Sequence, residues 1–267
     1  MVFICPKCKE KLEKQENSYK CPNAHSFDIA KQGYVNLLLG SKRGNHGDNK
    51  LMAVSRRDFL NKGYYEKFAD ALVKTVTEFS KQGDILIDCG CGEGYYTSRI
   101  ADSLKNITIA GFDISKNAIA LAAKRNKNIC FAVASSFSIP LNGKSADVLL
   151  EIFSPHNEPE FKRILKKGGY MIMAIPLENH LYSLKDAVYD TAYKNSVNDF
   201  EIDGFELIKN TEIKYTVNID SNEDIKNLFM MTPYYYKTGE KEQARLNTLQ
   251  YLQTELEFSI LVYKKCC

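Results

Sequence analysis

The sequence predicts a doubly wound α/β fold, with a mostly parallel seven-stranded sheet, preceded by a small N-terminal domain. Two observations lead to this expectation. From residue 84 onward, short apolar runs of strand length alternate with amphipathic segments of helix length, a pattern typical of a parallel sheet covered by helices on both faces. The first 25 residues instead carry closely spaced cysteines in a segment too short to bury a core, so they need another source of folding energy.

Four side chains in this first segment are metal-ligand candidates: Cys5, Cys8, Cys21 and His25. They form two close pairs, CxxC and CxxxH, and two such pairs are what a tetrahedral zinc ion requires. All four coordination positions are filled by protein, so the zinc is expected to be structural. Free thiols or two disulfides are the alternative. Because no signal peptide precedes Cys5, a reducing cytoplasm is the expected setting.

The positive charge of the chain is concentrated at its N-terminal end. Residues 1–62 hold twelve Lys and Arg against six Asp and Glu, whereas residues 63–267 hold 24 against 27. Five lysines surround the metal ligands: Lys7, Lys9, Lys11, Lys14 and Lys20. This balance predicts an anionic partner for the N-terminal part, with a solvated surface as the alternative. No run of 18 apolar residues is present, so no membrane span is expected.

The remaining elements follow in order along the chain. A polar stretch at 41–50 is expected to be a flexible loop, and helices are expected at 51–60 and 66–79. Strands are expected at 84–88, 107–114, 129–135, 146–155 and 168–176, with helices at 97–104, 116–125 and 159–165 between them. Segments 212–219 and 258–265 are expected to form a terminal antiparallel hairpin. The predicted domains are 1–40 (zinc-binding), 41–62 (linker and helix) and 63–267 (catalytic).

The first strand of the catalytic part runs into a glycine-rich loop. Asp88 ends the strand, and Gly90, Gly92 and Gly94 follow in the spacing GxGxG. Glycines let a backbone turn sharply and approach a ligand closely. Asp113 ends the next strand, about 20 residues further on, where an acidic side chain reaches ribose hydroxyls in doubly wound nucleotide sites. Dinucleotides normally require GxGxxG, so the spacing favours S-adenosylmethionine, with a ligand-free glycine turn as the alternative.

The loop GCGEG resembles the first motif of the class I methyltransferases. Together with the N-terminal motifs, it is similar to one family, the 23S ribosomal RNA (guanine-N1)-methyltransferases. The motifs that carry this resemblance span nearly the whole chain: CPKC…NSYKCPNAHSFDIAKQGYVNLL, RRDFLNKGYY, DCGCGEGYY, VASS, ENHLYSLK and MTPYYYK. The resemblance implies a Rossmann-like catalytic domain that uses S-adenosylmethionine and an N-terminal zinc ribbon that recognises RNA.

The resemblance also implies roles for single residues. The four N-terminal candidates become zinc ligands. Gly90, Gly92 and Glu93 line the methionine part of the cofactor, and Asp113 takes its ribose. The cofactor contacts in the family pattern are Tyr65, Gly92, Glu93 and His180. The alternatives are a packing aromatic at a helix start for Tyr65 and an ordinary surface histidine for His180.

The residues after the fourth strand bear on the methyl acceptor. They are FSPHNEP at 153–159, without the Asn/Asp-Pro-Pro-aromatic motif that positions an exocyclic amine and without a cysteine for attack on a pyrimidine ring. His156 and Glu158 are candidates, by position alone, for accepting the proton of guanine N1; the alternative is that neither acts. Phe153 and Tyr234 to Tyr236 are candidates for stacking an unpaired base, with core packing as their alternative.

The family resemblance implies a partner and a setting. The substrate is a hairpin loop of 23S rRNA that lines the peptide exit tunnel, and two branches of the family modify neighbouring guanines of that loop. The second branch resembles macrolide-resistance determinants, and a homodimer with a joint basic cleft is implied. Two other functions stay open: a small-molecule methyltransferase with the ribbon as a lid, and a non-catalytic zinc-ribbon RNA-binding protein. The basic N-terminal part disfavours the former, and the intact GCGEG with Asp113 disfavours the latter.

Overall fold

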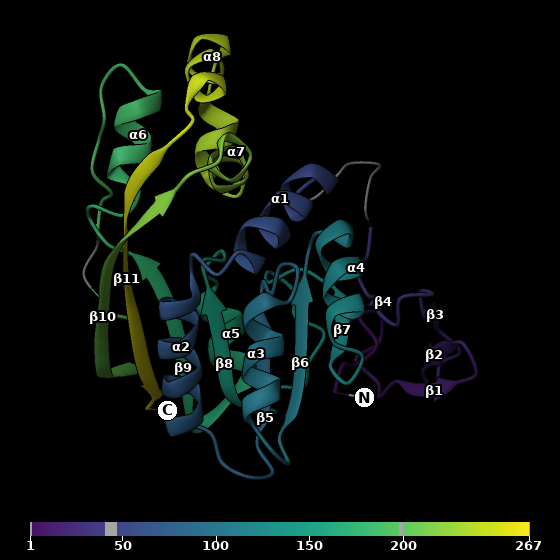
Figure 1. Ribbon diagram of the computed structural model, residues 1–267. Coiled ribbons are helices and arrows are strands. Elements are labelled where there is room, and N and C mark those ends of the chain that lie inside the picture. Colours follow the sequence, from purple (N-terminus) through teal and green to yellow (C-terminus); the bar gives the residue numbers. More distant parts are fainter. Residues whose placement is uncertain (1, 41–46, 198–199, 267) are drawn as a thin grey trace.

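The computed structural model describes residues 2–40, 47–197 and 200–266 of the 267-residue chain. A small antiparallel sheet lies at the N-terminal end, and a large sheet with helices on both faces forms the rest (Figure 1). The small sheet consists of β1 (Glu13–Gln15), β2 (Ser18–Lys20) and β3 (Ser26–Asp28). The predicted division into a small N-terminal unit and a doubly wound α/β unit therefore describes the observed architecture.

Five parallel strands form the centre of the large sheet. They are β5 (Ile85–Cys89), β6 (Thr108–Asp113), β7 (Cys130–Val133), β8 (Ala146–Ile152) and β9 (Leu165–Pro176). Their apolar runs are buried because helices cover both faces, as a parallel sheet requires. The helices between them are α3 (Tyr95–Ser103), α4 (Lys116–Arg125) and α5 (Glu158–Ile164). All five strands and three helices lie where the sequence predicts them.

An antiparallel hairpin extends one side of the sheet, as predicted. It consists of β10 (Phe205–Ile219) and β11 (Leu252–Lys265), and β11 also pairs with β9. Both strands begin earlier than the predicted 212 and 258. The inner strand β11 is almost continuously buried, whereas the outer strand β10 alternates between exposed and half-buried residues. This difference is expected between a central strand and an edge strand.

An eighth strand at the opposite edge was not predicted. It is β4 (Val35–Asn36), which pairs in parallel with β7, so the sheet order is β10-β11-β9-β8-β5-β6-β7-β4. A strand of two residues leaves no periodic signal in the sequence. Phe3 and Leu12 of the N-terminal part lie in the same buried cluster as Phe112 of β6. The N-terminal unit is therefore packed against the large sheet through a shared core.

Two helices connect the N-terminal unit to the first parallel strand, as predicted. They are α1 (Lys50–Asn61) and α2 (Glu66–Glu78), and α1 lies across the carboxyl edge of the sheet (Figure 1). The side chain of Asn49 caps α1 by accepting a hydrogen bond from the Met52 amide at 3.0 Å. Of the predicted loop at 41–50, residues 41–46 lie outside the described ranges. Asp48, just beyond them, is held in place because its carbonyl accepts a hydrogen bond from Ser115 Oγ at 2.6 Å.

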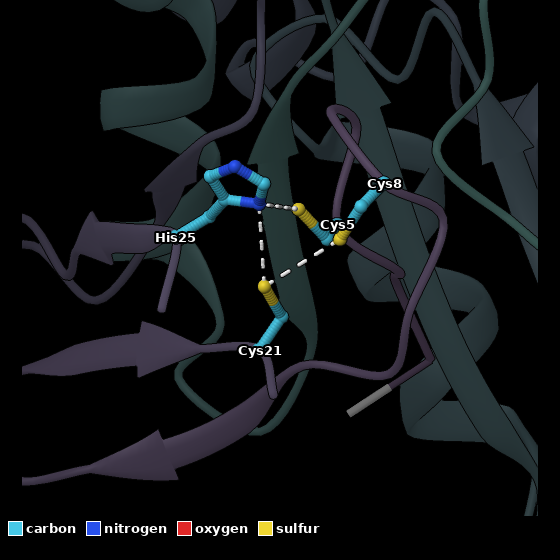
Figure 2. Close-up of side chains that lie close together, drawn as sticks. All are labelled: Cys5, Cys8, Cys21 and His25. Carbon is cyan, nitrogen blue, oxygen red and sulfur yellow. Dashed lines mark hydrogen bonds between the residues drawn. The ribbon is translucent and has the colours of Figure 1, made fainter. Parts of the chain in front are cut away.

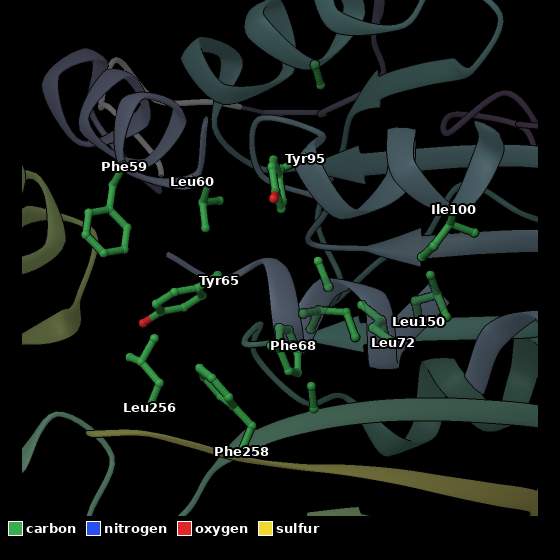
Figure 3. Packing of buried hydrophobic residues seen from close by; sticks show 14 of the residues in the cluster. Phe59, Leu60, Tyr65, Phe68, Leu72, Tyr95, Ile100, Leu150, Leu256 and Phe258 are labelled. Atoms are coloured by element: carbon green, nitrogen blue, oxygen red, sulfur yellow. The ribbon is translucent and has the colours of Figure 1, made fainter. Parts of the chain in front are cut away.

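A group of helices between β9 and β11 was also not predicted. It contains α6 (Tyr182–Val188), α7 (Asn222–Met230), the 3₁₀ helix η1 (Pro233–Lys237) and α8 (Glu240–Thr248). These helices stand above the carboxyl edge, and α7 contacts α1 (Figure 1). Below α1, aromatic side chains from α1, α2 and β11 pack into one layer, with Tyr65 between Phe59 and Phe258 (Figure 3). No helix within the described ranges is long and apolar enough to cross a membrane.

Candidate functional site

The four predicted metal ligands meet in the N-terminal unit (Figure 2). Cys8 Sγ lies 3.6 Å from Cys21 Sγ, and His25 Nδ1 lies 3.5 Å from Cys5 Sγ and 3.4 Å from Cys21 Sγ. A tetrahedron with arms of 2.3 Å has edges of about 3.8 Å, so these spacings fit a zinc ion with His25 bound through Nδ1. A disulfide would need about 2.05 Å between sulfurs, and the described cysteines are free thiols. The donor set therefore fits structural zinc.

Two local turns produce this arrangement. The Lys9 amide donates to the Cys5 carbonyl at 2.8 Å, and the Ala24 amide donates to the Cys21 carbonyl at 3.0 Å. Lys9 and Ala24 adopt left-handed backbone angles, with φ of 65° and 60°, so that each turn directs both of its ligands to one side. A backbone amide of the first turn is the main cause that lowers the pKa of the Cys8 thiol to about 6, which favours the thiolate that binds metal.

The metal unit is seated on the large sheet and presents lysines to solvent. The Ile4 amide donates to the Pro140 carbonyl at 2.9 Å, in the segment after β7. The five lysines predicted to surround the ligands, Lys7, Lys9, Lys11, Lys14 and Lys20, are all exposed. Lys11 pairs with Glu13 at 3.3 Å, and within the described ranges the other four form no ion pair. The unit therefore carries a surface of accessible cations beside the four metal-ligand side chains.

The glycine loop after β5 is shaped by close contacts. Gly90, Gly92 and Gly94 all have positive φ, at 78°, 55° and 80°. A Cβ on Gly90 would lie 2.4 Å from the Cβ of Ser154, and one on Gly94 would lie 2.9 Å from the Cβ of Ala122. Both the backbone angles and the space thus require glycine. The loop is pressed between α4 and the segment that follows β8.

Asp113 lies beside this loop with its carboxylate held by two amides. Oδ2 accepts a hydrogen bond from the Gly92 amide at 3.1 Å, and Oδ1 accepts one from the Ser115 amide at 2.7 Å. Burial raises the pKa of Asp113, and the Ser115 amide is the main cause that opposes it. Each carboxylate oxygen keeps a further lone pair, which fits the hydroxyl donors of a ribose. The predicted ribose acceptor is therefore fixed in orientation at the carboxyl edge.

Asp88 provides a second acceptor beneath the loop. Its Oδ2 accepts a hydrogen bond from the Thr97 hydroxyl at 2.5 Å, while Oδ1 is buried with no partner among the described residues. Burial raises the pKa of this carboxyl to about 7. An unpaired buried acceptor in a native fold indicates a missing donor, such as a ligand amine or an ordered water. The loop, Asp88 and Asp113 together fit the predicted S-adenosylmethionine site.

The Glu93 side chain differs from the other loop residues because its carboxylate is engaged in an ion pair with Arg125. Its carboxylate accepts hydrogen bonds from the Arg125 guanidinium, with Nε at 3.0 Å, and Arg125 also donates to Asn61 of α1 at 3.1 Å. The Glu93 side chain is buried, so this pair ties α1, the glycine loop and α4 together. A cofactor contact by Glu93, predicted from the family pattern, stays a prediction.

The two remaining predicted cofactor residues meet in space although 115 positions separate them. The rings of Tyr65 and His180 have centroids 6.4 Å apart, and both pack on Phe258, at 5.2 and 4.5 Å. His180 Nδ1 accepts a hydrogen bond from the Glu257 amide at 3.2 Å, which places the proton of the neutral ring on Nε2. Burial lowers the pKa of His180 to about 3, so the ring stays neutral.

Phe153 links this aromatic group to the glycine loop. It follows β8 directly, packs against Phe68 at 5.3 Å and Tyr96 at 6.4 Å, and still exposes 42% of its surface. Its φ of 54° is uncommon for a residue other than glycine, and such backbone strain is typical of binding and catalytic sites. The predicted stacking platform is thus an accessible ring at the carboxyl edge, backed by other rings.

The two candidate bases differ sharply in their surroundings. His156 Nδ1 lies 2.8 Å from Oε2 of Glu151, a buried carboxylate of β8 that the sequence analysis missed. This hydrogen bond is the main cause that raises the pKa of His156. When Nδ1–H donates to Glu151, Nε2 of the exposed ring is the acceptor. Glu158 instead pairs with Lys162 at 2.8 Å. His156 therefore has the arrangement of an oriented base, and Glu158 does not.

A network that the sequence analysis missed supports His180. Lys185 is buried, donates to Asn195 Oδ1 at 3.0 Å, and lies over the rings of Tyr193 and Tyr234 at 4.7 and 5.5 Å. Asn195 in turn donates to the His180 carbonyl at 3.1 Å. The motifs ENHLYSLK and MTPYYYK, which are distant in sequence, therefore meet around one buried lysine. Tyr234 belongs to this network and is half-buried in it.

Comparisons with known proteins find relatives for both parts of the chain. Residues 3–43 match a zinc-ribbon family model described as "RlmA, N-terminal", and residues 80–229 match one described as "Methyltransferase domain". The fold is similar to that of the YcgJ protein of Bacillus subtilis, with a TM-score of 0.50 at 14% identity, covering 74% of this chain and 98% of the other. At that identity the likeness concerns the fold alone.

Curated relatives are more similar in sequence. The chain is 33% identical over 187 residues to a 23S rRNA (guanine(748)-N(1))-methyltransferase of Streptomyces fradiae, covering 69% of this chain and 66% of the relative. It is 33% identical over 202 residues to a protein of Micromonospora griseorubida assigned as a 23S rRNA (guanine-N(1)-)-methyltransferase, covering 68% of each. It is 27% identical to the YxjB protein of Bacillus subtilis, with the same assignment, over 99% of this chain and 97% of that one.

Proposed function

Because the chain belongs to the 23S rRNA (guanine-N1)-methyltransferase family, we propose that it transfers a methyl group from S-adenosylmethionine to N1 of one guanine in 23S rRNA. The main support for this proposal is that one chain contains both a zinc-ligand cluster and a methyltransferase core. A zinc cluster of the family's own type is packed on a methyltransferase core with an intact glycine loop. Relatives that methylate other acceptors, such as a malonyl-[acyl-carrier protein] O-methyltransferase, match only about half of the chain, 52%.

The core residues position the cofactor. When bound, S-adenosylmethionine supplies an already activated methyl group, so the protein mainly aligns the acceptor nitrogen with it. Asp113 would accept hydrogen bonds from the ribose, and the loop around Gly90 and Gly92 would approach the methionine part. Tyr65 and the neutral His180, which pack on Phe258, would contact the cofactor from the side of β11. The orphaned acceptor on Asp88 supports this placement, because it needs a donor.

The acceptor guanine enters beside the segment after β8. Its N1 is on the Watson–Crick edge, so the base must be unpaired, and the exposed ring of Phe153 offers a stacking surface. During methyl transfer to N1, Nε2 of His156 would accept the N1 proton. Glu151 holds the His156 ring and stabilises its cationic form. Glu158 is not assigned a role, because its carboxylate is occupied by Lys162.

The N-terminal unit is the recognition arm. Its exposed lysines contact the phosphates of a hairpin loop, while the metal cluster keeps them in a fixed arrangement.

The domain division is residues 1–40 for recognition, 41–62 for linker and helix, and 63–267 for catalysis. The protein works in the cytoplasm, where the RNA is, and forms a homodimer with a joint basic cleft. The relative of Streptomyces fradiae is named for guanine 748, so this base and its neighbours are the first targets to examine, together with macrolide resistance.

The direct test combines purified protein, labelled S-adenosylmethionine and unmodified 23S rRNA. An N1 methyl blocks base pairing, so reverse transcription should stop at one loop guanine, and label should enter the RNA. Label without a stop would exclude N1 as the position, and a stop without label would show that the stop does not come from methyl transfer. Absence of both, with cofactor bound, would refute the RNA substrate and favour a small-molecule acceptor.

A further inference from the structure

One cation, Arg56 of α1, lies beside the glycine loop of the proposed cofactor site. Its Nη1 is 3.5 Å from the position that a Cβ would take on Gly92, so the guanidinium sits over the glycine loop. Its Nη2 is 2.9 Å from the Asp48 carboxylate and donates to the Met231 carbonyl at 3.2 Å. A single side chain thus connects the segment before α1, the loop, and the end of α7.

The hydrogen bonding of this guanidinium is incomplete. Nε of Arg56 is buried and has no partner among the described residues. An unpaired buried donor on a charged group is costly, and in a native fold it indicates a partner that completes it. Around it lie the carboxylates of Asp48, Glu93 and Asp113; burial raises the pKa of Glu93 and Asp113, and Arg56 is among the charges that oppose this. Of these, Glu93 is occupied by Arg125 and Asp113 by two amides.

The chemistry of the cofactor identifies the missing partner. Its methionine part carries a sulfonium and an ammonium, which a guanidinium repels, and one carboxylate, which a guanidinium binds with charge-assisted hydrogen bonds. We propose that Arg56 binds the carboxylate of S-adenosylmethionine and that the cofactor thereby fastens α1 and the end of α7 over the site. This inference rests on the proposed function, since it assumes S-adenosylmethionine in the loop.

The consequence is that cofactor occupancy orders the surface that receives RNA. α1 follows directly on the segment that leads from the N-terminal unit, and α7 belongs to the helices above the carboxyl edge (Figure 1). Both are held by the same guanidinium, so a carboxylate at Nε adds a third attachment at their meeting point. The protein then presents an ordered acceptor site mainly when the methyl donor is in place.

Calorimetric titration with two ligands tests the contact. The ligands are S-adenosylmethionine and its decarboxylated analogue, which lacks only the carboxylate. The variants are Arg56→Met, Arg56→Lys and the control Arg57→Met. Arg57 is the neighbouring arginine, and its guanidinium pairs with Asp58 at 2.7 Å. Arg56→Met should lose about 10- to 100-fold in affinity for S-adenosylmethionine and less than about threefold for the analogue. Arg56→Lys should lose less, with the same selectivity, and Arg57→Met should match the wild type for both.

Several results would overturn the inference. Equal losses for the two ligands in Arg56→Met and Arg56→Lys would mean that Arg56 only supports the fold, and no loss would mean that it does not reach the ligand. If the wild type binds neither ligand, the proposed function itself fails, which is a distinct outcome. Hydrogen exchange tests the second half of the proposal: S-adenosylmethionine should slow exchange in α1 and α7 of the wild type, and the analogue should not. Equal slowing by both ligands would contradict it.

Discussion

The zinc cluster and the carboxyl edge of the sheet are built in opposite ways. All four zinc ligands come from residues 5–25, and two hydrogen-bonded turns place them. The carboxyl edge draws its parts from segments distant in sequence, such as Arg56 and Met231, which are 175 residues apart, and the packing of helices over the sheet brings them together. A site of the first kind depends on its metal, whereas a site of the second kind depends on the whole sheet. The two can therefore be perturbed separately.

Loss of the metal should have the largest effect of the changes considered, and this effect should be confined to the N-terminal unit. Cys8→Ser removes one of four ligands, and structural zinc contributes about 10–16 kcal/mol to folding in finger peptides. We expect zinc content and RNA binding to be lost while affinity for S-adenosylmethionine changes less than about threefold, since the loop lies in the other site. Metal analysis and calorimetry check this. Equal losses of RNA and cofactor binding would show that the sites are not separate.

The protonation of Asp88 probes the site at the carboxyl edge of the sheet, because it makes the stability of the protein depend on pH. Its folded pKa of about 7 lies above the unfolded value of about 3.9, so its contribution to stability is full below pH 4 and is lost as the pH rises through 7. Between pH 5 and pH 8, Asp88→Asn should therefore gain about 2–3 kcal/mol relative to the wild type. Urea unfolding at the two pH values measures this difference. A difference that does not change with pH would mean that the carboxyl is ionised in the folded protein throughout.

The glycine loop can be probed by a matched pair of substitutions. Gly90 and Gly168 both have positive φ, at 78° and 72°, but a Cβ would meet Ser154 at 2.4 Å in the first case and nothing within 4 Å in the second. Gly168→Ala should cost roughly 1–2 kcal/mol through its backbone angle alone. Gly90→Ala should cost roughly 2–4 kcal/mol, because overpacking is added, and should also weaken cofactor binding. Similar losses in both variants would show that the contact with Ser154 is not restrictive.

The same contrast explains what the sequence could predict. The four metal-ligand candidates and the five parallel strands are encoded by local spacing and by apolar runs. The four side chains meet in one cluster that fits zinc, and the five strands lie where they were predicted. The strand β4 was not predicted because two residues show no periodicity. Glu151 was not predicted as a site residue because nothing in an apolar strand marks it as the partner of His156. The position of Arg56 over Gly92 depends on how α1 crosses the sheet, and the spacing of residues along the sequence does not predict that crossing. Local chemistry was predictable, and contacts between distant segments were not.

The most direct measurement is nucleoside mass spectrometry of 23S rRNA after reaction with the protein and S-adenosylmethionine. The proposed function predicts one 1-methylguanosine per RNA molecule, located in the hairpin-loop fragment that contains the guanine of the reverse-transcription stop. Cys8→Ser protein should leave this nucleoside unmethylated although it still binds the cofactor. Methylation at another atom, at many guanines, or at the same level with Cys8→Ser protein would contradict the account of a zinc unit that directs a methyl-transfer core to one base.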